Sequence, residues 1–524
     1  MSQMLKSSGA MAVATLASRV LGLVREMVYA RFLGIGLVAS AFYFAFTIPN
    51  LFRRLLGEGA LTAAFIPHFK EKEKLAGEAE MWRAANAVIS GLLVLAAGVV
   101  LVMILVSSAL IWSRAFSSKT TLMLDLLRCM APYLLLVCLA AILMGMLNAR
   151  GHFFVPAMGS AMLNLVMIGS VFWIAPALGK TLERQVFGLA IGVVIAGFAQ
   201  CFYQLPLIRK EGFRYRWVTP WGDASARLVA RQMVPGVLGV AAFQINVMVT
   251  QGLGFWVADH IVASFSYAVR LMELPQGLFG VSLATYLLPT LSGLAADKKL
   301  SEFRSTLQQG LGYVLFTNTA AAALLMVLAE PIIRLLFESG KFDAQATQRV
   351  AHALWCLAPG LLAFSVVNIT ARAFYALGDT HTPTKISIFC LVLNLVLVGL
   401  LVRPLEQAGM GLANTVTSSV NMVLLLYALK KKLGKLEFTL LWRSLPALLG
   451  TGVVTGLAAW AGMRFWEQHL GHANFPLRFG AVFAPTIGAG MVYLLCTWMF
   501  RIGYGSEVIA LLSSRAKRVI WGAN

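Results

Sequence analysis

Two adjacent arginines and a glutamate interrupt an apolar stretch, NLFRRLLGEGA, at residues 50–60. On a helix, Asn50, Arg54 and Glu58 share one face because residues four apart lie one turn from each other, and Arg53 lies beside them. A guanidinium group presents a fork of donors that matches the oxygens of a carboxylate or a phosphate. The stretch therefore indicates either an ion pair between Arg54 and Glu58 that holds helices together, or a binding site for an anion.

Further arginines stand in two other apolar stretches. Arg19 and Arg25 are six residues apart, which is roughly 240° around a helix. They cannot share a narrow stripe, so they either flank one wide cavity or one of them extends its apolar stem to the membrane surface. Arg270 and Glu273 are three residues apart and share one face of a helix.

The composition places these charges inside a membrane protein. The chain has 524 residues, of which 59% are hydrophobic and only 12% are charged, about half of the roughly 25% that is usual in soluble proteins. Apolar runs of about 20 residues recur along its length, and each is long enough to cross a bilayer as a helix. The sequence lacks the ten-residue alternation of an outer-membrane barrel. We therefore predict an all-α polytopic membrane protein with 14 transmembrane helices, at residues 10–33, 38–66, 84–112, 122–148, 155–178, 185–208, 232–257, 261–291, 306–329, 348–376, 384–402, 408–429, 441–463 and 478–500.

An arginine at the centre of a bilayer costs about 2.5–3.5 kcal/mol on insertion scales. Arg53 and Arg54 should therefore face protein or water rather than lipid. Arg31, Arg128 and Arg372 lie near the ends of the expected spans, where a side chain that reaches the interface is the simpler explanation.

The distribution of positive charge predicts the orientation. Of the 43 Lys and Arg residues, 25 fall on the side of the N-terminus and ten on the other side of the expected spans. This asymmetry places the N-terminus in the cytoplasm, and an even number of spans places the C-terminus there too. The net charge of +21 is then mostly an anchor for cytoplasmic loops, and we expect no nucleic-acid partner.

The chain also repeats itself. Residues 42–62 align with residues 265–285 at an offset of 223, and residues 131–135 align with 358–362 at an offset of 227. Each copy holds six spans, so both copies have the same orientation and are related by an axis along the membrane normal, with the binding site expected between them. We expect an N-lobe at residues 1–215, a C-lobe at 216–436, and two additional helices with a cytoplasmic tail at 437–524.

The repeat separates the charges that the fold needs from those it does not. The second copy has Gln276 and Gly277 where the first has Arg53 and Arg54, and it has Glu273 where the first has Asn50. The same architecture therefore forms without those two cations. We infer a shared central cavity, cationic mainly on the first-half side, that binds an anion during its passage across the bilayer.

Other chemistries find little support in the sequence. The six cysteines form no C-x-x-C pair, the seven histidines show no ligand spacing, and no D-x-D motif occurs, so we expect no metal, no cofactor and no catalytic residue. A polyprenyl-phosphate glycosyltransferase would use an acidic metal motif, and an exporter of cationic drugs would need intramembrane carboxylates rather than arginines. We expect a transporter, not an enzyme.

Four stretches resemble one family: SRVLGLVRE (18–26), NLFRRLLGEGA (50–60), YAVRLMELPQGLFGVSLATYLLPTLS (267–292) and RAFYALGDTHTPTK (372–385). They are similar to the MurJ (MviN) family of bacterial lipid II flippases, within the MOP exporter superfamily. The resemblance implies two pseudo-symmetric six-helix lobes of the MATE type and two extra C-terminal helices. It also implies that the chain moves lipid II, the undecaprenyl-diphosphate-linked peptidoglycan precursor, from the cytoplasmic to the periplasmic leaflet of the inner membrane.

The resemblance also implies a set of site residues. Matched to the family's cavity are Arg19, Arg25, Asn50, Arg53, Arg54, Glu58, Arg270 and Glu273, with Ser18, Glu26 and Arg372 as support. The chain departs from some members at Ser40, Val269 and Asn368, so we predict no scheme for proton or sodium coupling. The expected partners are lipid II, membrane lipids and other proteins of cell-wall synthesis. A flippase for another polyprenyl-diphosphate oligosaccharide, such as an O-antigen unit, would use the same physics, and only the family motifs argue against it.

One further segment, at residues 330–342, is apolar enough to lie on the membrane surface outside the cell. It is expected to be either an interfacial linker or a gate.

Overall fold

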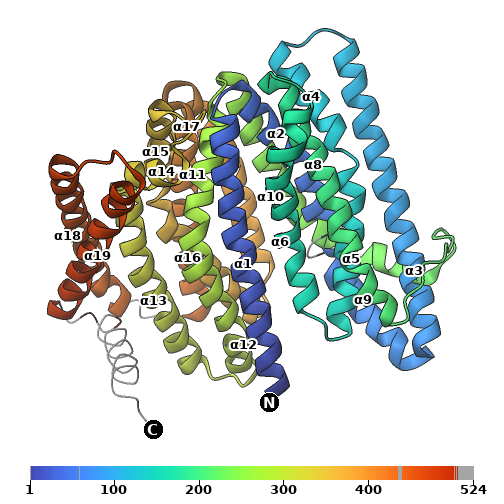
Figure 1. The fold of residues 1–524 in the computed structure, drawn as a ribbon. Helices are drawn as coiled ribbons and strands as arrows, with labels where there is room; N and C mark the ends of the chain where they lie inside the picture. Colours follow the sequence, from blue (N-terminus) through green and yellow to red (C-terminus); the bar gives the residue numbers. More distant parts are fainter. Residues whose placement is uncertain (1, 58–59, 435–438, 501, 503, 505–524) are drawn as a thin grey trace. The chain divides into compact units, whose positions relative to one another are not determined.

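The computed structural model describes the chain except for residues 1, 58–59, 435–438, 501, 503 and 505–524. Every regular element among the described residues is helical (Figure 1), which confirms the predicted all-α class. The chain divides into two compact units, and each is described by itself below. Unit 1 holds residues 1–263 and 339–342, and unit 2 holds residues 264–338 and 343–524.

Unit 1 contains the helices of the predicted N-lobe and, in addition, α10, which the repeat assigned to the C-lobe. Its elements are α1 (Ser2–Leu33), α2 (Leu37–Phe52), the π-helical turn η1 (Arg53–Gly57), α3 (Ala60–Trp112), α4 (Ser118–Met130), α5 (Tyr133–Ala149), α6 (Phe154–Gly169), η2 (Ser170–Ile174), α7 (Ala175–Ala177), α8 (Leu182–Phe202), α9 (Leu205–Lys210) and α10 (Ala224–Val257). Helix α10 packs against α3 and α2. The boundary between these contact units lies at residue 263, and the lobe boundary at residue 215, which the repeat predicts, stays a prediction.

Unit 2 begins inside the next helix. Its elements are α11 (Ile261–Pro275, from residue 264 on), η3 (Gln276–Val281), α12 (Ser282–Ala296), α13 (Leu300–Val327), α14 (Ala329–Phe337), α15 (Ala344–Leu357), α16 (Gly360–Ala376), α17 (His381–Leu433), α18 (Thr439–His469) and α19 (Phe475–Met499). Helices α18 and α19 lie side by side in Figure 1, and α18 packs against α13.

Long apolar helices account for most of the expected spans. Among the described residues, nine helices are long and apolar enough to cross a bilayer, or up to 11 if each of two bent helix pairs is counted as one span. Two helices of 53 residues each contain a break, α3 at Gly77 and α17 at Glu406, where the backbone leaves the helical conformation. The multi-pass prediction is confirmed, and the count of 14 stays a prediction.

The sequence repeat reappears in the helix bounds. Helix α5 spans residues 133–149 and α16 spans residues 360–376, so both ends differ by the offset of 227 that the sequence predicted. The bend before each of these helices is also similar, 41° between α4 and α5 and 46° between α15 and α16. After each helix a glycine turns the chain with a positive φ, at Gly151 (+87°) and Gly378 (+72°), a conformation that glycine adopts without steric cost.

Each unit has its own apolar core. In unit 1 the largest buried side chains around α3 and α5 include Phe65, Phe69 and Leu143. In unit 2 the core joins α12, α13 and α16, with Phe303 and Phe374 fully buried. The core of unit 2 includes α16, the helix that carries Arg372.

Candidate functional site

Arg25 on α1 is buried, with 7% of its surface exposed, and forms an ion pair with the neighbouring Glu26. The second carboxylate oxygen of Glu26 accepts a hydrogen bond of 2.8 Å from the hydroxyl of Tyr43 on α2. Nη1 of Arg25 lies 3.6 Å from the sulfur of Met167 on α6. In this conformation the charge of Arg25 is therefore paired within unit 1. Tyr43 contacts the same carboxylate, although the sequence did not predict a role for it.

The Arg25 guanidinium retains donor capacity. Its Nε is buried and makes no hydrogen bond to any described residue. A buried donor without an acceptor costs about 1–3 kcal/mol. An acceptor oxygen at this position would satisfy the Nε donor.

Arg19, two helical turns before Arg25, is exposed. Its neighbour Ser18 is half-buried, and the Ser18 carbonyl oxygen accepts a hydrogen bond of 3.2 Å from the Asn164 amide on α6. The two arginines of α1 thus differ in environment, as their angular separation on the helix predicted. Arg19 is exposed, whereas Arg25 is buried and paired with Glu26.

Arg53 and Arg54 are the first two residues of the π-helical turn η1 and are half-buried. Nε of Arg53 donates a hydrogen bond of 2.8 Å to the side-chain oxygen of Asn50, one turn earlier. This contact confirms that Asn50 and Arg53 meet on one side of the segment. Glu58 lies outside the described residues, so the pair expected between Arg54 and Glu58 stays a prediction.

A second π-helical turn occupies the equivalent place in the repeat. Turn η3 spans residues 276–281, and residues 53–57 of η1 shifted by 223 are residues 276–280. π-Helical turns are rare and occur often at functional sites. The alignment matched these residues, but nothing in their side chains predicted the turn itself.

Arg270 and Glu273 lie on α11 in unit 2, one turn before η3. Their side chains are 45% and 47% exposed, and Nη1 of Arg270 lies 2.8 Å from Oε2 of Glu273. The spacing of three residues predicted this contact. Arg372 is half-buried on α16, also in unit 2. The predicted residues thus form one group in unit 1 and another in unit 2, and the cavity that would join them stays a prediction.

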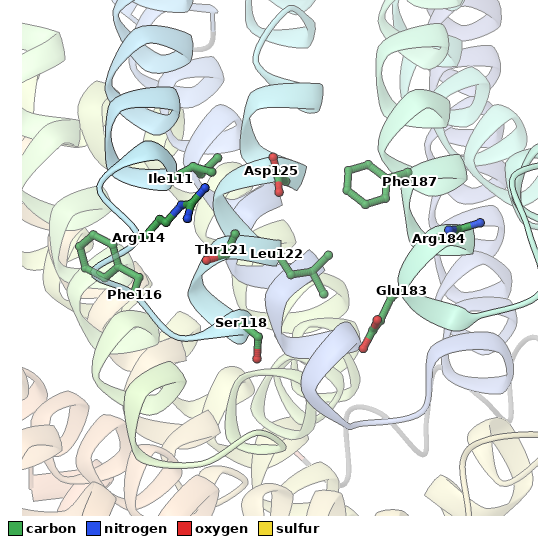
Figure 2. Close-up of a pocket in the computed structure, with 10 residues that line it drawn as sticks. All are labelled: Ile111, Arg114, Phe116, Ser118, Thr121, Leu122, Asp125, Glu183, Arg184 and Phe187. Atoms are coloured by element: carbon green, nitrogen blue, oxygen red, sulfur yellow. The ribbon is translucent and has the colours of Figure 1, made fainter.

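Unit 1 also has an open pocket of about 550 Å³ at the ends of α3, α4 and α8 (Figure 2). It contains none of the predicted site residues. Its charged lining residues are Arg114, Asp125, Glu183 and Arg184, so positive and negative charges balance. In Figure 2 the Arg184 guanidinium is directed away from the other lining residues. The pocket offers no concentrated positive charge for a diphosphate.

Arg150 is the centre of an ionic cluster in unit 1. It follows α5 and pairs with three carboxylates, Glu73, Glu78 and Glu211, while His152 also contacts Glu211 at 2.8 Å. The hydrogen bond to His152 and the Arg150 guanidinium hold the pKa of Glu211 below its ordinary value. The hydrogen bonds to Glu211 and Glu78 raise the pKa of Arg150. The cluster ties the turn after α5 to α3 and α9.

At the equivalent turn of the repeat, unit 2 also has an ion pair, with the charges reversed. Asp379 is the counterpart of His152 at the offset of 227, and it forms an ion pair of 2.6 Å with Lys432 near the end of α17. Its hydrogen bonds with Lys432 and the Thr382 amide lower the pKa of Asp379. Both units therefore tie the same turn to a later helix, with an acid in one copy where the other has a histidine.

The segment expected at residues 330–342 begins as the helix α14. Arg334 on this helix is 14% exposed and contacts Glu330, Glu338 and Glu467, the last at 2.9 Å on α18. His472, between α18 and α19, lies 2.7 Å from Glu467. These ion pairs fix α14 to the two helices that have no counterpart in the repeat. Such fixed contacts within unit 2 fit a structural linker better than a freely moving gate.

No group of three or more His, Cys, Asp or Glu side chains within the described part of the chain could hold a metal ion. The candidate site is therefore described by its guanidinium groups and their carboxylate partners.

This chain is similar to known proteins over most of its length. Residues 29–479 match the family described as "Lipid II flippase MurJ". A probable lipid II flippase MurJ of Vibrio cholerae is 33% identical over 473 residues, which is 87% of this chain and 89% of that protein. A probable lipid II flippase MurJ of Bdellovibrio bacteriovorus is 33% identical over 523 residues, which is 96% and 97% of the two chains.

Solved structures show the same fold. A lipid II flippase MurJ in an inward closed conformation superposes with a TM-score of 0.77 at 22% identity, covering 94% of this chain and 98% of that one. An inward-facing multidrug resistance MATE family transporter of the MOP superfamily superposes with a TM-score of 0.68 at 14% identity, covering 82% and 99%. The similarity to both shows that this chain shares their fold.

Proposed function

The chain belongs to the lipid II flippase MurJ family, and from that premise we propose how its residues flip lipid II. The protein is a multi-pass membrane transporter whose substrate is the lipid-linked peptidoglycan precursor. The headgroup enters a cavity between the two halves from the cytoplasm, the halves rock, and the headgroup leaves toward the periplasm. The polyprenyl tail stays in an apolar path throughout, with both chain termini in the cytoplasm.

The observation that carries this mechanism is the placement of the accessible arginines. Arg19 is exposed, Arg53 and Arg54 are half-buried on η1, and Arg270 is about half exposed one turn before η3. Guanidinium forks bind phosphate oxygens in a bidentate manner and keep their charge at every physiological pH. We assign Arg19, Arg53 and Arg270 to contact with the diphosphate, and Asn50 to the orientation of Arg53.

Arg25 has a different part in the proposal. Because Glu26 neutralises it in this conformation, a diphosphate would have to compete with Glu26 for the same guanidinium. Substrate entry would then release Glu26 toward Tyr43, which already donates to it. Such an exchange keeps the Arg25 guanidinium paired with an anion, and the Tyr43 hydroxyl would still donate to the released Glu26 carboxylate.

The experiment that tests the proposal is complementation of a bacterium depleted of its own flippase. Arg19→Ala, Arg53→Ala and Arg270→Ala are tested separately at matched expression, with Arg184→Ala as the control because Arg184 is exposed and directed away from its pocket. We expect loss or strong reduction of growth for the first three and full growth for the control. Full growth of all three site variants would contradict the mechanism.

A vesicle assay then tests the substrate. Proteoliposomes are supplied with lipid II or with another polyprenyl-diphosphate oligosaccharide, and accessibility of the headgroup is measured on each side. We expect movement of lipid II to be faster. Equal movement of both lipids would show that the cavity recognises the diphosphate and not the peptidoglycan headgroup.

A further inference from the structure

An extended segment at residues 213–219 lies along α3 in unit 1, visible as the light green loop beside α3 in Figure 1. Two polar side chains of α3 hold it. The Asn86 amide donates a hydrogen bond of 3.1 Å to the Arg214 carbonyl oxygen, and the Ser90 hydroxyl accepts one of 3.3 Å from the Val218 amide. Asn86 and Ser90 are buried and one helical turn apart, so this face of α3 is built to receive a backbone.

Apolar contacts hold both ends of the segment. Phe213 is buried and its ring lies 5.5 Å from the ring of Trp82 on α3. At the other end, a Cβ atom on Gly91 would lie only 3.3 Å from the Pro220 side chain, so a small residue is needed there. The segment therefore has a fixed position against the helix.

The outward side of the segment is basic and aromatic. We define the collar by six exposed side chains: Arg214, Tyr215, Arg216, Trp217, Trp221 and Arg227. The two acids nearby are already engaged, since Glu211 pairs with Arg150 and His152, and Asp223 caps α10 through the amides of Ser225 and Ala226. Asp223 keeps its negative charge when it accepts from backbone amides, but the three collar arginines outnumber it, so the collar has a net positive charge.

The length of α3 places the collar at a membrane surface. From Ser90 to Trp112, which is 86% exposed, the helix runs 22 residues, or about 33 Å, close to the roughly 30 Å of a bilayer core. The exposed side chains between them are apolar, among them Leu95, Leu101 and Leu105. Tryptophan is enriched at both interfaces of a bilayer. With Trp112 at one interface, Trp217 and Trp221 lie at the other.

We propose that the collar is a binding surface for anionic glycerophospholipids, with the arginines on the lipid phosphates and the tryptophans among the glycerol groups. A basic residue near an anionic membrane surface contributes about 1 kcal/mol, and the collar holds three of them on a backbone that is already ordered. In the proposed orientation this is the cytoplasmic leaflet. The inference concerns lipid binding alone and does not depend on the flipping mechanism.

The test uses the full chain in micelles of a neutral detergent, titrated with fluorescent phosphatidylglycerol and, separately, with fluorescent phosphatidylcholine. We expect tighter binding of phosphatidylglycerol. Arg214→Gln/Arg216→Gln should weaken it by roughly 25-fold, since about 1 kcal/mol per residue is about fivefold each. The matched control is Lys430→Gln/Lys431→Gln, two exposed lysines predicted to face the same leaflet but outside the collar. An equal loss in this control would show general charge attraction and overturn the proposal.

A second variant separates the effect of the ordered backbone from the effect of the arginine charges. Asn86→Leu/Ser90→Ala keeps every arginine but removes the two anchors of the segment. We expect it to lose at least half of the phosphatidylglycerol preference while eluting as a folded monodisperse protein. Inorganic phosphate at millimolar concentration should not compete with the lipid. Unchanged preference in the anchor variant, or full competition by inorganic phosphate, would refute a lipid-binding collar.

Discussion

The ion pair between Arg25 and Glu26 offers a test that separates stability from transport. The two side chains are 9% and 3% exposed, so replacing Arg25 with Met leaves a buried carboxylate without its guanidinium partner. Removing one member of a buried pair costs about 3–5 kcal/mol. We therefore expect Arg25→Met to lower the free energy of unfolding of unit 1 by about that amount.

The double variant Arg25→Met/Glu26→Gln removes both charges at similar volume. Replacing a buried pair by uncharged residues is often neutral or stabilising, so we expect stability within about 1 kcal/mol of the parent protein. The free energy of unfolding is measured by detergent-induced unfolding of the purified chain in mixed micelles. The control is Arg270→Gln/Glu273→Gln, an exposed pair, for which each single change should cost less than about 1 kcal/mol.

The same variants then enter the complementation assay. If Arg25 exchanges Glu26 for the diphosphate, the double variant is stable but does not support growth. Two results would refute this reasoning. Stability of Arg25→Met within about 0.5 kcal/mol of the parent would mean that the pair is solvated, and full growth of the stable double variant would mean that Arg25 has no contact with substrate.

Three further predictions concern Arg150, the Asp379–Lys432 pair and Glu211. Arg150→Met loses three carboxylate partners and should lower the midpoint of thermal unfolding by several degrees. Arg83→Met, whose ion pair with Glu80 is exposed, should leave this midpoint nearly unchanged. The charge swap Asp379→Lys/Lys432→Asp should recover most of the thermal stability that either single change loses, and no recovery would mean that the 2.6 Å pair is not a stabilising contact. Because the pKa of Glu211 is lowered in the folded protein, its stabilising contribution is present above the ordinary glutamate pKa of about 4.3 and is lost as the pH falls through the lower folded value. Thermal unfolding from pH 6 to 3 should show this loss, and Glu211→Gln should reduce it.

Much of the fold could be predicted because it follows from apolar length and from the repeat. The offset of 227 between the APYLL and APGLL stretches matches both ends of α5 and α16. The breaks inside α3 and α17 fall in the loops predicted at residues 67–83 and 403–407, but the backbone conformation at these breaks could not be predicted. At Glu406 a non-glycine residue takes φ of 51°, a conformation that only the surrounding packing can impose. The position of α10 within unit 1 is likewise a matter of packing, since the repeat describes ancestry and not contact.

Part of the site could also be predicted, because some of its contacts follow from local helix geometry. Contacts between residues three apart, such as Arg53 with Asn50 and Arg270 with Glu273, follow from helix geometry. The pair of Arg25 with Glu26 does not, because adjacent residues point about 100° apart on a helix and do not face each other. Only burial between α1, α2 and α6 brings these two long side chains together, and burial depends on neighbours that the local sequence does not identify.

Of the three π-helical turns among the described residues, η1 and η3 lie at equivalent places in the repeat and suggest which part of the mechanism is shared between the halves. A π-helical turn adds a residue to a turn of helix and weakens its regular hydrogen bonding, so it marks a point where a helix bends at low cost. The chain has such a turn at residues 53–57 and at residues 276–281, although one carries two arginines and the other a glutamine and a glycine. The backbone feature is therefore independent of the charge placed on it. If bending at both turns drives the rocking of the halves, replacing the half-buried Gln276 with arginine should leave bending intact and change only how strongly the substrate is held. Slower release of lipid II with unchanged headgroup entry would support this separation, and loss of both would show that the turn in the second half cannot carry charge and still bend.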